Sequence, residues 1–440
     1  MPIGRLIARL AIPSSVALFV TSTYNLVDTI FVGRGVGPLA IGALALVFPL
    51  QIFVMAFGNL IGIGAASIVS RSLGAGQPDR ARSAAGTAVT LAVGIGVVVA
   101  AAGSLFPDQL VTILGGTDDL RDLTIAYVTV ILIAEPFHLF NLAAASLIRA
   151  EGQARVAMAT MVAGMVVNIA LDPLFIFAFG WGVQGAAAAT LIGHIVSTVM
   201  IGAFYVRGRG TIRLRAKDLR PRRSVVAETL RIGSSGFVRQ VSTSVVHGLR
   251  NNLLVLSGGT LFVSAFGVVF RSLLFLALPA MGIAQALPPI AGYNYGAHRM
   301  DRVRRSVWLS IGSCTLFMWI GFVIMWLFPG ALFRLFSNDV DLIELGIPIM
   351  RVNALALLTF PIYFNGPSFY QAIGKPGRAL VLASARPILA AIVMLIGVRL
   401  VGPLGVVASD PIALAIGSIM VVVFLLRSFS GSGELGRGSS

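Results

Sequence analysis

The chain has 440 residues, of which 57% are hydrophobic and only 11% are charged, and its mean hydropathy is +0.92. Soluble domains carry about 25% charged residues, so the composition excludes a soluble globular protein and predicts an all-α integral membrane protein. The net charge of +16 would also suit a nucleic-acid binder, but the basic residues lie in short loops between apolar runs, where they set membrane topology. We therefore expect no nucleic-acid partner.

The apolar runs predict about twelve membrane-spanning helices, because each crossing needs about 20 apolar residues. In chain order the runs cover residues 6–32, 39–70, 84–106, 121–148, 155–179, 183–205, 226–256, 260–291, 304–328, 341–372, 379–400 and 404–427. The pattern predicts an amino-terminal six-helix lobe over 1–205, a basic linker over 206–225 and a carboxy-terminal six-helix lobe over 226–427. The Gly/Ser-rich tail, 428–440, is typical of a disordered end.

Arginine and lysine gather in alternate loops, whereas most loop acids lie in the other set. The first set includes the linker, with Arg207, Arg209, Arg213, Arg215, Lys217, Arg220, Arg222 and Arg223. The second set carries Asp108, Asp118, Asp119, Asp122, Asp339, Asp341 and Glu344. By the positive-inside rule the linker and both termini face the cytoplasm, and we expect a multi-pass protein of the cytoplasmic (inner) membrane.

The sequence repeats internally at an offset of about 220 residues. Leu10-Ala-Ile-Pro-Ser-Ser15 recurs as Leu230-Arg-Ile-Gly-Ser-Ser235, and Leu73-Gly-Ala-Gly-Gln-Pro-Asp-Arg80 recurs as Tyr295-Gly-Ala-His-Arg-Met-Asp-Arg302. Because each half has an even number of spans, both halves enter the membrane from the same side. The repeat predicts two lobes related by a pseudo-twofold axis along the membrane normal.

Two carboxylates fall inside apolar runs of the first half, Asp28 and Asp172. A carboxylate at membrane depth costs a few kcal/mol and therefore marks a candidate functional site. Asn168 lies one helical turn before Asp172, on the same face of the helix, where its amide can donate to the carboxylate or help bind Na⁺. The competing interpretations are a carboxylate at a helix end and an Asn that only packs helices together.

Other polar groups at membrane depth are weaker candidates. Glu135 precedes Pro136 and has His138 as a possible partner, and Asp410 precedes Pro411 in the last span. Arg271, with Arg239 and Arg250, falls in spans seven and eight. Each of these groups could line an aqueous cleft or lie near a membrane interface.

Signals of an enzyme are absent from the sequence. The four histidines are scattered, and no Gly-x-x-x-x-Gly-Lys-Ser/Thr phosphate loop is present. We predict no catalytic residues, no metal cofactor and no organic cofactor. Two carboxylates at membrane depth, in one half of a duplicated helical protein, suggest a proton- or cation-coupled transporter, whose energy should then come from an ion gradient.

Four phrases of the sequence carry a family resemblance when they are taken together. They are Tyr24-Asn-Leu-Val-Asp-Thr-Ile-Phe-Val-Gly33, Leu147-Ile-Arg-Ala-Glu-Gly152, Asn168-Ile-Ala-Leu-Asp-Pro-Leu-Phe-Ile176 and Pro289-Ile-Ala-Gly-Tyr-Asn-Tyr-Gly296. With these phrases the chain resembles the multidrug and toxic compound extrusion (MATE) family, over about residues 6–427. The resemblance implies two six-helix lobes with an export cavity between them. It also implies that the coupling residues are Asp28, Asn168, Asp172 and Thr190, with Tyr127 in the substrate cavity and Pro13 as a hinge.

The chain departs from other members of that family in its second half. Acids that one subgroup carries in the seventh and tenth helices are missing here, and the seventh span offers Arg239, His247 and Arg250 instead. Asp410 lies before, not after, the proline of the last helix. Coupling through the carboxy-terminal lobe is therefore not expected.

The resulting hypothesis is a monomeric secondary exporter of small amphipathic or cationic compounds that works by alternating access. Protons are the expected coupling ion, and Na⁺ bound at Asp28, Asn168, Asp172 and Thr190 is the alternative. Membrane lipids are expected partners. The alternative function is a flippase for lipids or lipid-linked oligosaccharides. A carrier of anionic pyrophosphate head groups requires several arginines in its cavity, and Arg239, Arg250 and Arg271 could supply them.

Overall fold

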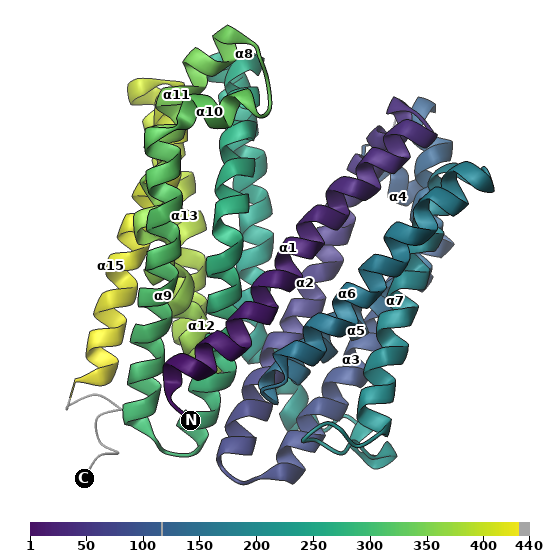
Figure 1. The fold of residues 1–440 in the computed structure, drawn as a ribbon, viewed down its shortest axis with the longest axis vertical. Coiled ribbons are helices and arrows are strands. Elements are labelled where there is room, and N and C mark those ends of the chain that lie inside the picture. Colours follow the sequence, from purple (N-terminus) through teal and green to yellow (C-terminus); the bar gives the residue numbers. More distant parts are fainter. Residues whose placement is uncertain (116–117, 431–440) are drawn as a thin grey trace. The chain divides into compact units, whose positions relative to one another are not determined.

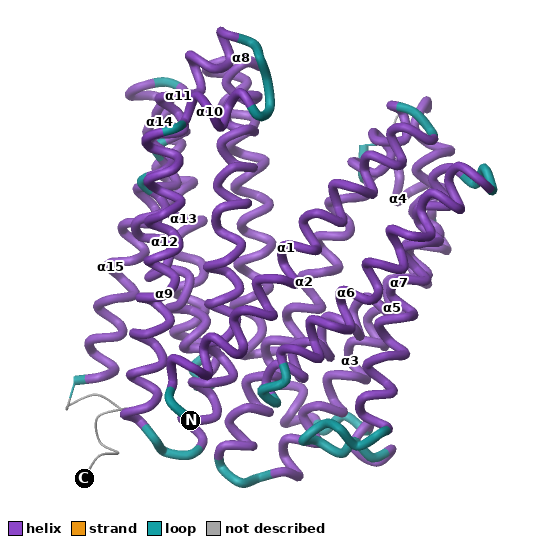
Figure 2. The backbone as a smooth tube through the Cα atoms, in the orientation of Figure 1, coloured by secondary structure: helices purple, strands orange, loops and turns teal. Residues whose placement is uncertain are grey.

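The computed structural model describes residues 1–115 and 118–430, and every regular element within them is a helix (Figures 1 and 2). The all-α prediction is confirmed. In this part of the chain, ten helices are long and apolar enough to cross a membrane, and a bent pair, Val340–Ala354 with Ala356–Ala372, makes eleven. One of the ten, α8 (Arg223–Gly296), has 74 residues and a non-helical Gly259 inside it. Counting α8 as two spans gives the expected twelve.

The chain divides into two compact units, and both transitions fall inside helices. The amino-terminal unit is Val16–Gly233, and the carboxy-terminal unit combines Met1–Ser15 with the chain from Ser234 onward. The first transition lies in α1 (Ile3–Gly35), and the second lies in α8. The segment 206–225, expected to separate the lobes, is part of the amino-terminal unit.

The amino-terminal unit contains most of α1 and the first turns of α8. Between them lie α2 (Pro38–Gly74), α3 (Pro78–Leu105), α4 (Pro107–Ile113), α5 (Asp118–Ala150), α6 (Ala154–Pro173), the π-helical turn η1 (Leu174–Ala178), α7 (Gly182–Val206) and the 3-10 turn η2 (Ala216–Leu219). One core cluster joins α2, α3 and α5 through small and branched side chains such as Ile61, Ala85 and Leu139. Another joins α1, α2, α5 and α7.

The basic segment that follows α7 is fixed to its own unit by hydrogen bonds. The backbone N–H groups of Thr211 and Ile212 donate to Glu151 Oε2 at 2.6 and 3.2 Å, and Tyr205 donates to Glu151 Oε1 at 2.8 Å. Thr90 Oγ1 donates to the Leu219 carbonyl at 2.6 Å. These bonds hold the segment against α3 and the end of α5.

The carboxy-terminal unit contains the first turns of α1 and most of α8. It continues with α9 (Met300–Leu327), α10 (Pro329–Arg334), α11 (Val340–Ala354), α12 (Ala356–Ala372), α13 (Pro376–Val401), α14 (Pro403–Val407) and α15 (Ser409–Phe429). Its core includes Leu287, Val307, Phe369 and Leu414. The expected tail began at Ser428, but α15 continues through Phe429, and residues 431–440 lie outside the described residues.

The turns of the two units repeat each other. After α2 the left-handed residue is Gly76 (φ 68°), and after α8 it is His298 (φ 57°), 222 positions later. Gly152 (φ 82°) and Gly374 (φ 73°) form a second such pair. Glycine is the usual residue in this conformation because it has no Cβ. His298 takes the same left-handed conformation as Gly76 although its Cβ makes that conformation less favourable. The structure thus shows the duplication that the sequence predicts.

Candidate functional site

Five polar residues of the amino-terminal unit, predicted from sequence, lie on four of its helices. Asp28 is on α1, Tyr127 is on α5, Asn168 and Asp172 are on α6, and Thr190 is on α7. Asp172 is completely buried, Asn168 is 2% exposed and Tyr127 is 5% exposed, whereas Asp28 and Thr190 are partly exposed. The charges of Asp28 and Asp172 interact with each other, and Tyr127 interacts with both carboxylates. The structure therefore brings these residues into one group, which we call the carboxylate cluster.

Thr190 connects two helices to its own within this cluster. Asn168 Nδ2 donates to Thr190 Oγ1 at 3.1 Å, and the Tyr24 hydroxyl lies 3.4 Å from the same oxygen. Tyr24 also interacts electrostatically with both Asp28 and Asp172. The hydroxyl of Thr190 thus links α1 and α6 to α7.

Several buried oxygens of the cluster have no hydrogen-bond partner. They are Asp28 Oδ1, Asn168 Oδ1, Asp172 Oδ1 and Asp172 Oδ2. Buried polar atoms in folded proteins are nearly always paired, and an exception calls for an explanation. All four atoms are acceptors, so a hydrogen-bond donor, a proton or a cation would satisfy them. Carboxylate, amide and hydroxyl oxygens are also the ligands that hard cations prefer, and the set therefore fits H⁺ and Na⁺ alike.

Close helix packing positions the cluster. A Cβ added at Gly193 of α7 would lie 2.7 Å from the Gly164 carbonyl oxygen of α6, and one added at Gly164 would lie 2.5 Å from the Gly193 oxygen. Backbones approach this closely in membranes only where residues are small. Gly164 is one turn before Asn168, and Gly193 follows Thr190 by three residues. The contact between Gly164 and Gly193 therefore fixes how far α6 lies from α7, and so how far Asn168 lies from Thr190.

The helix that carries Asp172 changes form directly after it. Pro173 ends the α-helical part of α6, and Leu174–Ala178 form a π-helical turn, η1. Short π-helical segments occur often at functional sites. The turn leaves the side chain of Asp172 buried at the end of a regular helix.

Two further residues of this group were not predicted as site residues. Tyr24 lies one turn before Asp28 in α1, and that spacing of four residues was the available signal. Gln51 of α2 shares a hydrogen bond with Tyr127. Its sequence neighbours are apolar, so only the packing of α2 against α5 reveals its place.

Glu135 lies in a different polar group of the same unit. It is 3% exposed, and its Oε2 is 3.1 Å from His138 Nδ1. The His138 ring stacks on the His194 ring with 4.8 Å between centroids. The structure thus pairs Glu135 with His138, as the sequence predicts.

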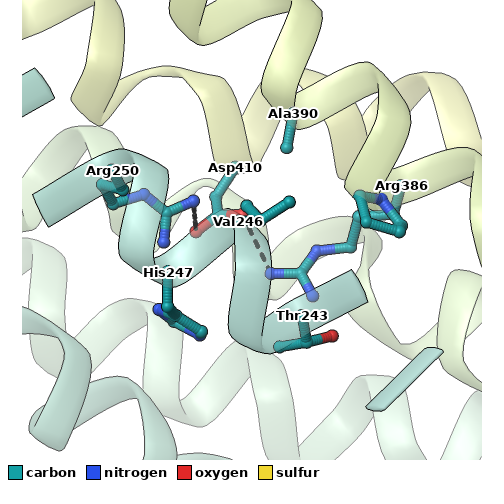
Figure 3. A pocket seen from close by; sticks show the side chains of 8 residues that line it. Thr243, Val246, His247, Arg250, Arg386, Ala390 and Asp410 are labelled. Carbon is teal, nitrogen blue, oxygen red and sulfur yellow. Dashed lines mark hydrogen bonds and ion pairs between the residues drawn. The ribbon is translucent and has the colours of Figure 1, made fainter. Parts of the chain in front are cut away.

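Asp410 lies in the carboxy-terminal unit and is paired with two arginines (Figure 3). Arg250 Nη2 is 2.7 Å from Asp410 Oδ2, and Arg386 Nη2 is 2.9 Å from Oδ1. Arg386 of α13 was not singled out in the sequence. Arg271, by contrast, is exposed on α8. The structure thus joins Asp410 to Arg250 but does not join Arg271 to either.

Pro13 is buried inside α1, which remains helical on both sides of it. A proline removes a backbone donor and weakens the helix where it stands. Ser14, the next residue, donates its hydroxyl to the Leu10 carbonyl at 2.9 Å. The transition between the two units follows Ser15, two residues after this proline.

Known proteins match the chain along almost its whole length. A multidrug export protein, MepA, from Staphylococcus aureus (strain MSSA476) is 27% identical over 430 residues, which cover 97% of this chain and 94% of that protein. MepA of Staphylococcus saprophyticus is 26% identical over 419 residues, covering 95% of this chain and 92% of that protein.

Solved structures show the same fold. An outward-facing multidrug resistance MATE family transporter of the MOP superfamily has a TM-score of 0.91 and 26% identity, covering all of this chain and 97% of that one. A MOP superfamily transporter from Pyrococcus furiosus, described as having a binding pocket of reverse polarity that suggests a different function, has a TM-score of 0.89 and 26% identity. That match covers 97% of this chain and 96% of the other.

The family model described as MatE matches residues 13–174 and 242–396. The first segment contains Asp28, Asn168 and Asp172, and the second contains Arg250 and Arg386. The two segments correspond to the two repeats and together make up more than half of the sequence. The chain therefore belongs to the MatE family, whose transporters its sequence resembles.

Proposed function

We propose that the protein is a multidrug exporter of the cytoplasmic membrane that exchanges H⁺ for small amphipathic or cationic compounds by alternating access. The observation that carries the proposal is the carboxylate cluster, with its four buried oxygens that have no partner. The similarity to multidrug export proteins supports the kind of cargo. Twelve apolar spans support a membrane carrier.

A proton bound to the carboxylate cluster would supply the hydrogen-bond donor that its unpaired oxygens lack. When Asp172 is protonated it carries an O–H donor, and Asn168 Oδ1 lies one turn away on the same face of α6 without a donor. When Asp28 and Asp172 are both ionised, their like charges repel in a buried place, and a cation is attracted. The same group therefore holds either a proton or a cationic species, and the two compete.

Coupling follows when the proton and the cargo favour different conformations. A ligand shifts a conformational equilibrium only by its difference in affinity for the two states. Protonation removes the attraction for a cation and relieves the repulsion between Asp28 and Asp172. Pro13 has no backbone N–H and therefore weakens α1 at its position, so α1 can bend there when the cluster is protonated.

The flippase alternative gains little from the arginines that suggested it. A carrier of anionic head groups needs accessible cationic side chains, whereas Arg250 is only 1% exposed and pairs with Asp410. Arg271 is exposed on α8. One accessible arginine is not the group of cationic side chains that a pyrophosphate head group would require.

The test uses purified protein in liposomes loaded with a fluorescent organic cation. A pH gradient is imposed in the absence of sodium, and dye movement is followed by fluorescence. We expect gradient-driven movement in the natural protein and a loss of at least about tenfold in Asp172→Asn, which keeps the shape of the side chain but cannot ionise. A tenfold change in rate corresponds to about 1.4 kcal/mol.

Asp122→Asn is the matched control, because Asp122 is an exposed carboxylate on α5. This variant should transport at the natural rate. Movement driven by a sodium gradient alone would keep the exporter and replace the coupling ion. Undiminished proton-driven transport by Asp172→Asn would refute the assignment of the cluster.

A further inference from the structure

We propose that the carboxy-terminal unit binds a monatomic anion of the halide class between Arg250, Arg386 and Asp410. The three side chains come from α8, α13 and α15, and they converge on a small cavity that is also lined by Thr243 and His247 (Figure 3). This site is independent of the carboxylate cluster, which lies in the other unit.

The charges at this place do not balance. Two guanidinium groups face one carboxylate, so the three side chains carry a net charge of +1 (two positive charges and one negative). Arg250 is 1% exposed and Asp410 is 7% exposed, whereas the Arg386 side chain is 25% exposed with its Nε buried. Arg239 of α8 adds a further positive charge that interacts with Arg386. A buried charge without a counter-charge is costly, and the excess here is positive.

The guanidinium groups also have donors to spare. Arg250 Nε and Nη1 and Arg386 Nε are buried without a hydrogen-bond acceptor. Arg250 Nη2 lies 2.7 Å from Asp410 Oδ2, which is an ion contact, but its geometry does not make a directed hydrogen bond. Asp410 meets one arginine with each of its oxygens, and neither oxygen accepts a hydrogen bond from the unpaired Nε and Nη1 of Arg250 or Nε of Arg386.

The surroundings of Arg250 supply no acceptor either. One face of its guanidinium lies over the Phe266 ring, 4.9 Å from the centroid. His247, one turn before Arg250, packs its ring edge-to-face on Phe270 at 4.7 Å. The rest of the lining is Val246, Pro387 and Ala390, which are apolar, and Thr243, whose hydroxyl does not accept from the unpaired N–H groups of Arg250. An anion that accepts from the arginines is the ligand that this lining lacks.

The size of the cavity limits the ligand. Its volume is about 10 Å³, close to the lower bound for holding one water molecule. A chloride or bromide ion is larger than a water molecule, but it exceeds this volume by less than an organic carboxylate or a sulfate does. Water is the competing occupant, but water does not neutralise the excess charge. We therefore choose chloride and bromide as probes.

The experiment measures thermal unfolding of the full-length protein in detergent. Sodium gluconate is replaced stepwise by sodium chloride or sodium bromide at constant ionic strength and constant sodium. We expect the unfolding midpoint to rise with halide concentration and to saturate, as linkage requires for a ligand that binds the folded state. Sulfate should not reproduce the rise. An unchanged midpoint, or an equal rise with sulfate, would overturn the proposal.

Two variants and one control locate the effect. Arg386→Gln leaves Arg250 and Asp410 as a neutral pair, so the dependence on halide should disappear. Asp410→Asn raises the net charge of the group, so its midpoint should depend on halide more steeply than that of the natural protein. Arg399→Gln removes an exposed arginine from the same helix, α13, and should respond like the natural protein. Equal responses of Arg386→Gln and Arg399→Gln would place the halide elsewhere and refute the site.

A direct readout is independent of how well the variants fold. Crystals of the natural protein grown in bromide should show an anomalous peak beside the guanidinium groups of Arg250 and Arg386. The absence of that peak in crystals that diffract well enough to place the two side chains would contradict the proposal. Because neither measurement uses transport, failure here leaves the proposed exchange of protons for drugs untouched.

Discussion

Asp172, Glu135 and Asp410 are all buried acids of one membrane protein, yet their surroundings differ. Asp410 meets two arginines, and Glu135 meets a histidine. Asp172 is completely buried and has no hydrogen-bond partner for either oxygen. A paired carboxylate is held in one charge state by its partner, whereas an unpaired one is free to exchange a proton or a cation. On this ground Asp172 is the strongest candidate for ion exchange among the three.

Thr190 provides a test of the bonds that hold the carboxylate cluster. In Thr190→Val the shape is kept, but Asn168 loses its acceptor and Tyr24 loses its neighbour. A buried donor left without a partner costs about 1–3 kcal/mol, so the thermal midpoint of purified Thr190→Val should fall. Differential scanning fluorimetry measures the change.

Thr23→Val is the control for this substitution, since Thr23 is exposed and bonds only to the Phe19 carbonyl of its own helix. Its midpoint should stay close to that of the natural protein. Equal midpoints for Thr190→Val and Thr23→Val would mean that the hydroxyl of Thr190 contributes nothing to the cluster.

Sequence alone could predict the cluster only in part. Asp28 and Asp172 stand out because a carboxylate within an apolar run is conspicuous, and Asn168 follows from helical spacing. The family resemblance, and not helical spacing, is the basis for predicting Thr190, Tyr127 and Pro13 as site residues. Gln51 could not be found, because its partner Tyr127 lies on another helix. Arg386 is a charged residue inside the apolar run 379–400, so a signal for it was present in the sequence, but its pairing with Asp410 was not. Contacts of that kind depend on how helices pack, and a periodic pattern carries no information about it.

At the scale of helices, glycine contacts decide which faces meet. The α6–α7 contact pairs Gly164 with Gly193, and in the carboxy-terminal unit Gly397 of α13 meets Gly405 of α14 in the same way. In both places a Cβ would lie within 3 Å of the opposite backbone. Lipid supplies no hydrophobic force between helices, so close contact of backbones is a main source of association.

Gly193→Ala tests the packing of α6 against α7. The added methyl group would meet backbone atoms of Gly164, which cannot rotate away, so the helices must separate. Overpacking of this kind costs about 1–3 kcal/mol, and it also moves Thr190 away from Asn168. We expect a lower thermal midpoint together with weaker proton-driven dye transport.

Gly202→Ala is the matched control on the same helix, because a Cβ there meets nothing within 4 Å. Replacing glycine by alanine in a helix interior favours the helix by about 1 kcal/mol. The control should therefore be as stable as the natural protein or slightly more stable. A loss of stability of similar size in both variants would show that the α6–α7 contact is not special.

At the scale of the whole molecule, the two repeats keep their backbone turns but differ in their buried charges. Gly76 and His298 take the same left-handed conformation in equivalent turns, so the fold of the repeat persists. In the amino-terminal unit two acids interact with each other, the buried Asp172 and the partly exposed Asp28. The carboxy-terminal unit pairs the buried Arg250 and the partly exposed Arg386 with the single acid Asp410. We infer that duplication supplied the scaffold and that each copy then took its own electrostatic role.

The number and order of helices were predictable for a different reason. The thickness of the bilayer requires apolar runs of about 20 residues, and such runs are easy to recognise in a sequence. The transitions between the two units have no such signal, because α1 continues as a helix across Ser15 and α8 continues across Gly233. Where one compact unit ends is decided by contacts between helices, and the hydropathy of a helix does not report them.

The membrane topology yields the last prediction. The single cysteine, Cys314, is buried, so Cys314→Ala gives a background in which new cysteines report accessibility. Arg207→Cys lies in the basic segment after α7, and Asp119→Cys lies near the start of α5; both positions are exposed. The positive-inside rule places the first in the cytoplasm and the second outside. A membrane-impermeant maleimide should label Asp119→Cys in intact cells but Arg207→Cys only after lysis. The reverse pattern would invert the topology and would require H⁺ and cargo to move in the opposite directions.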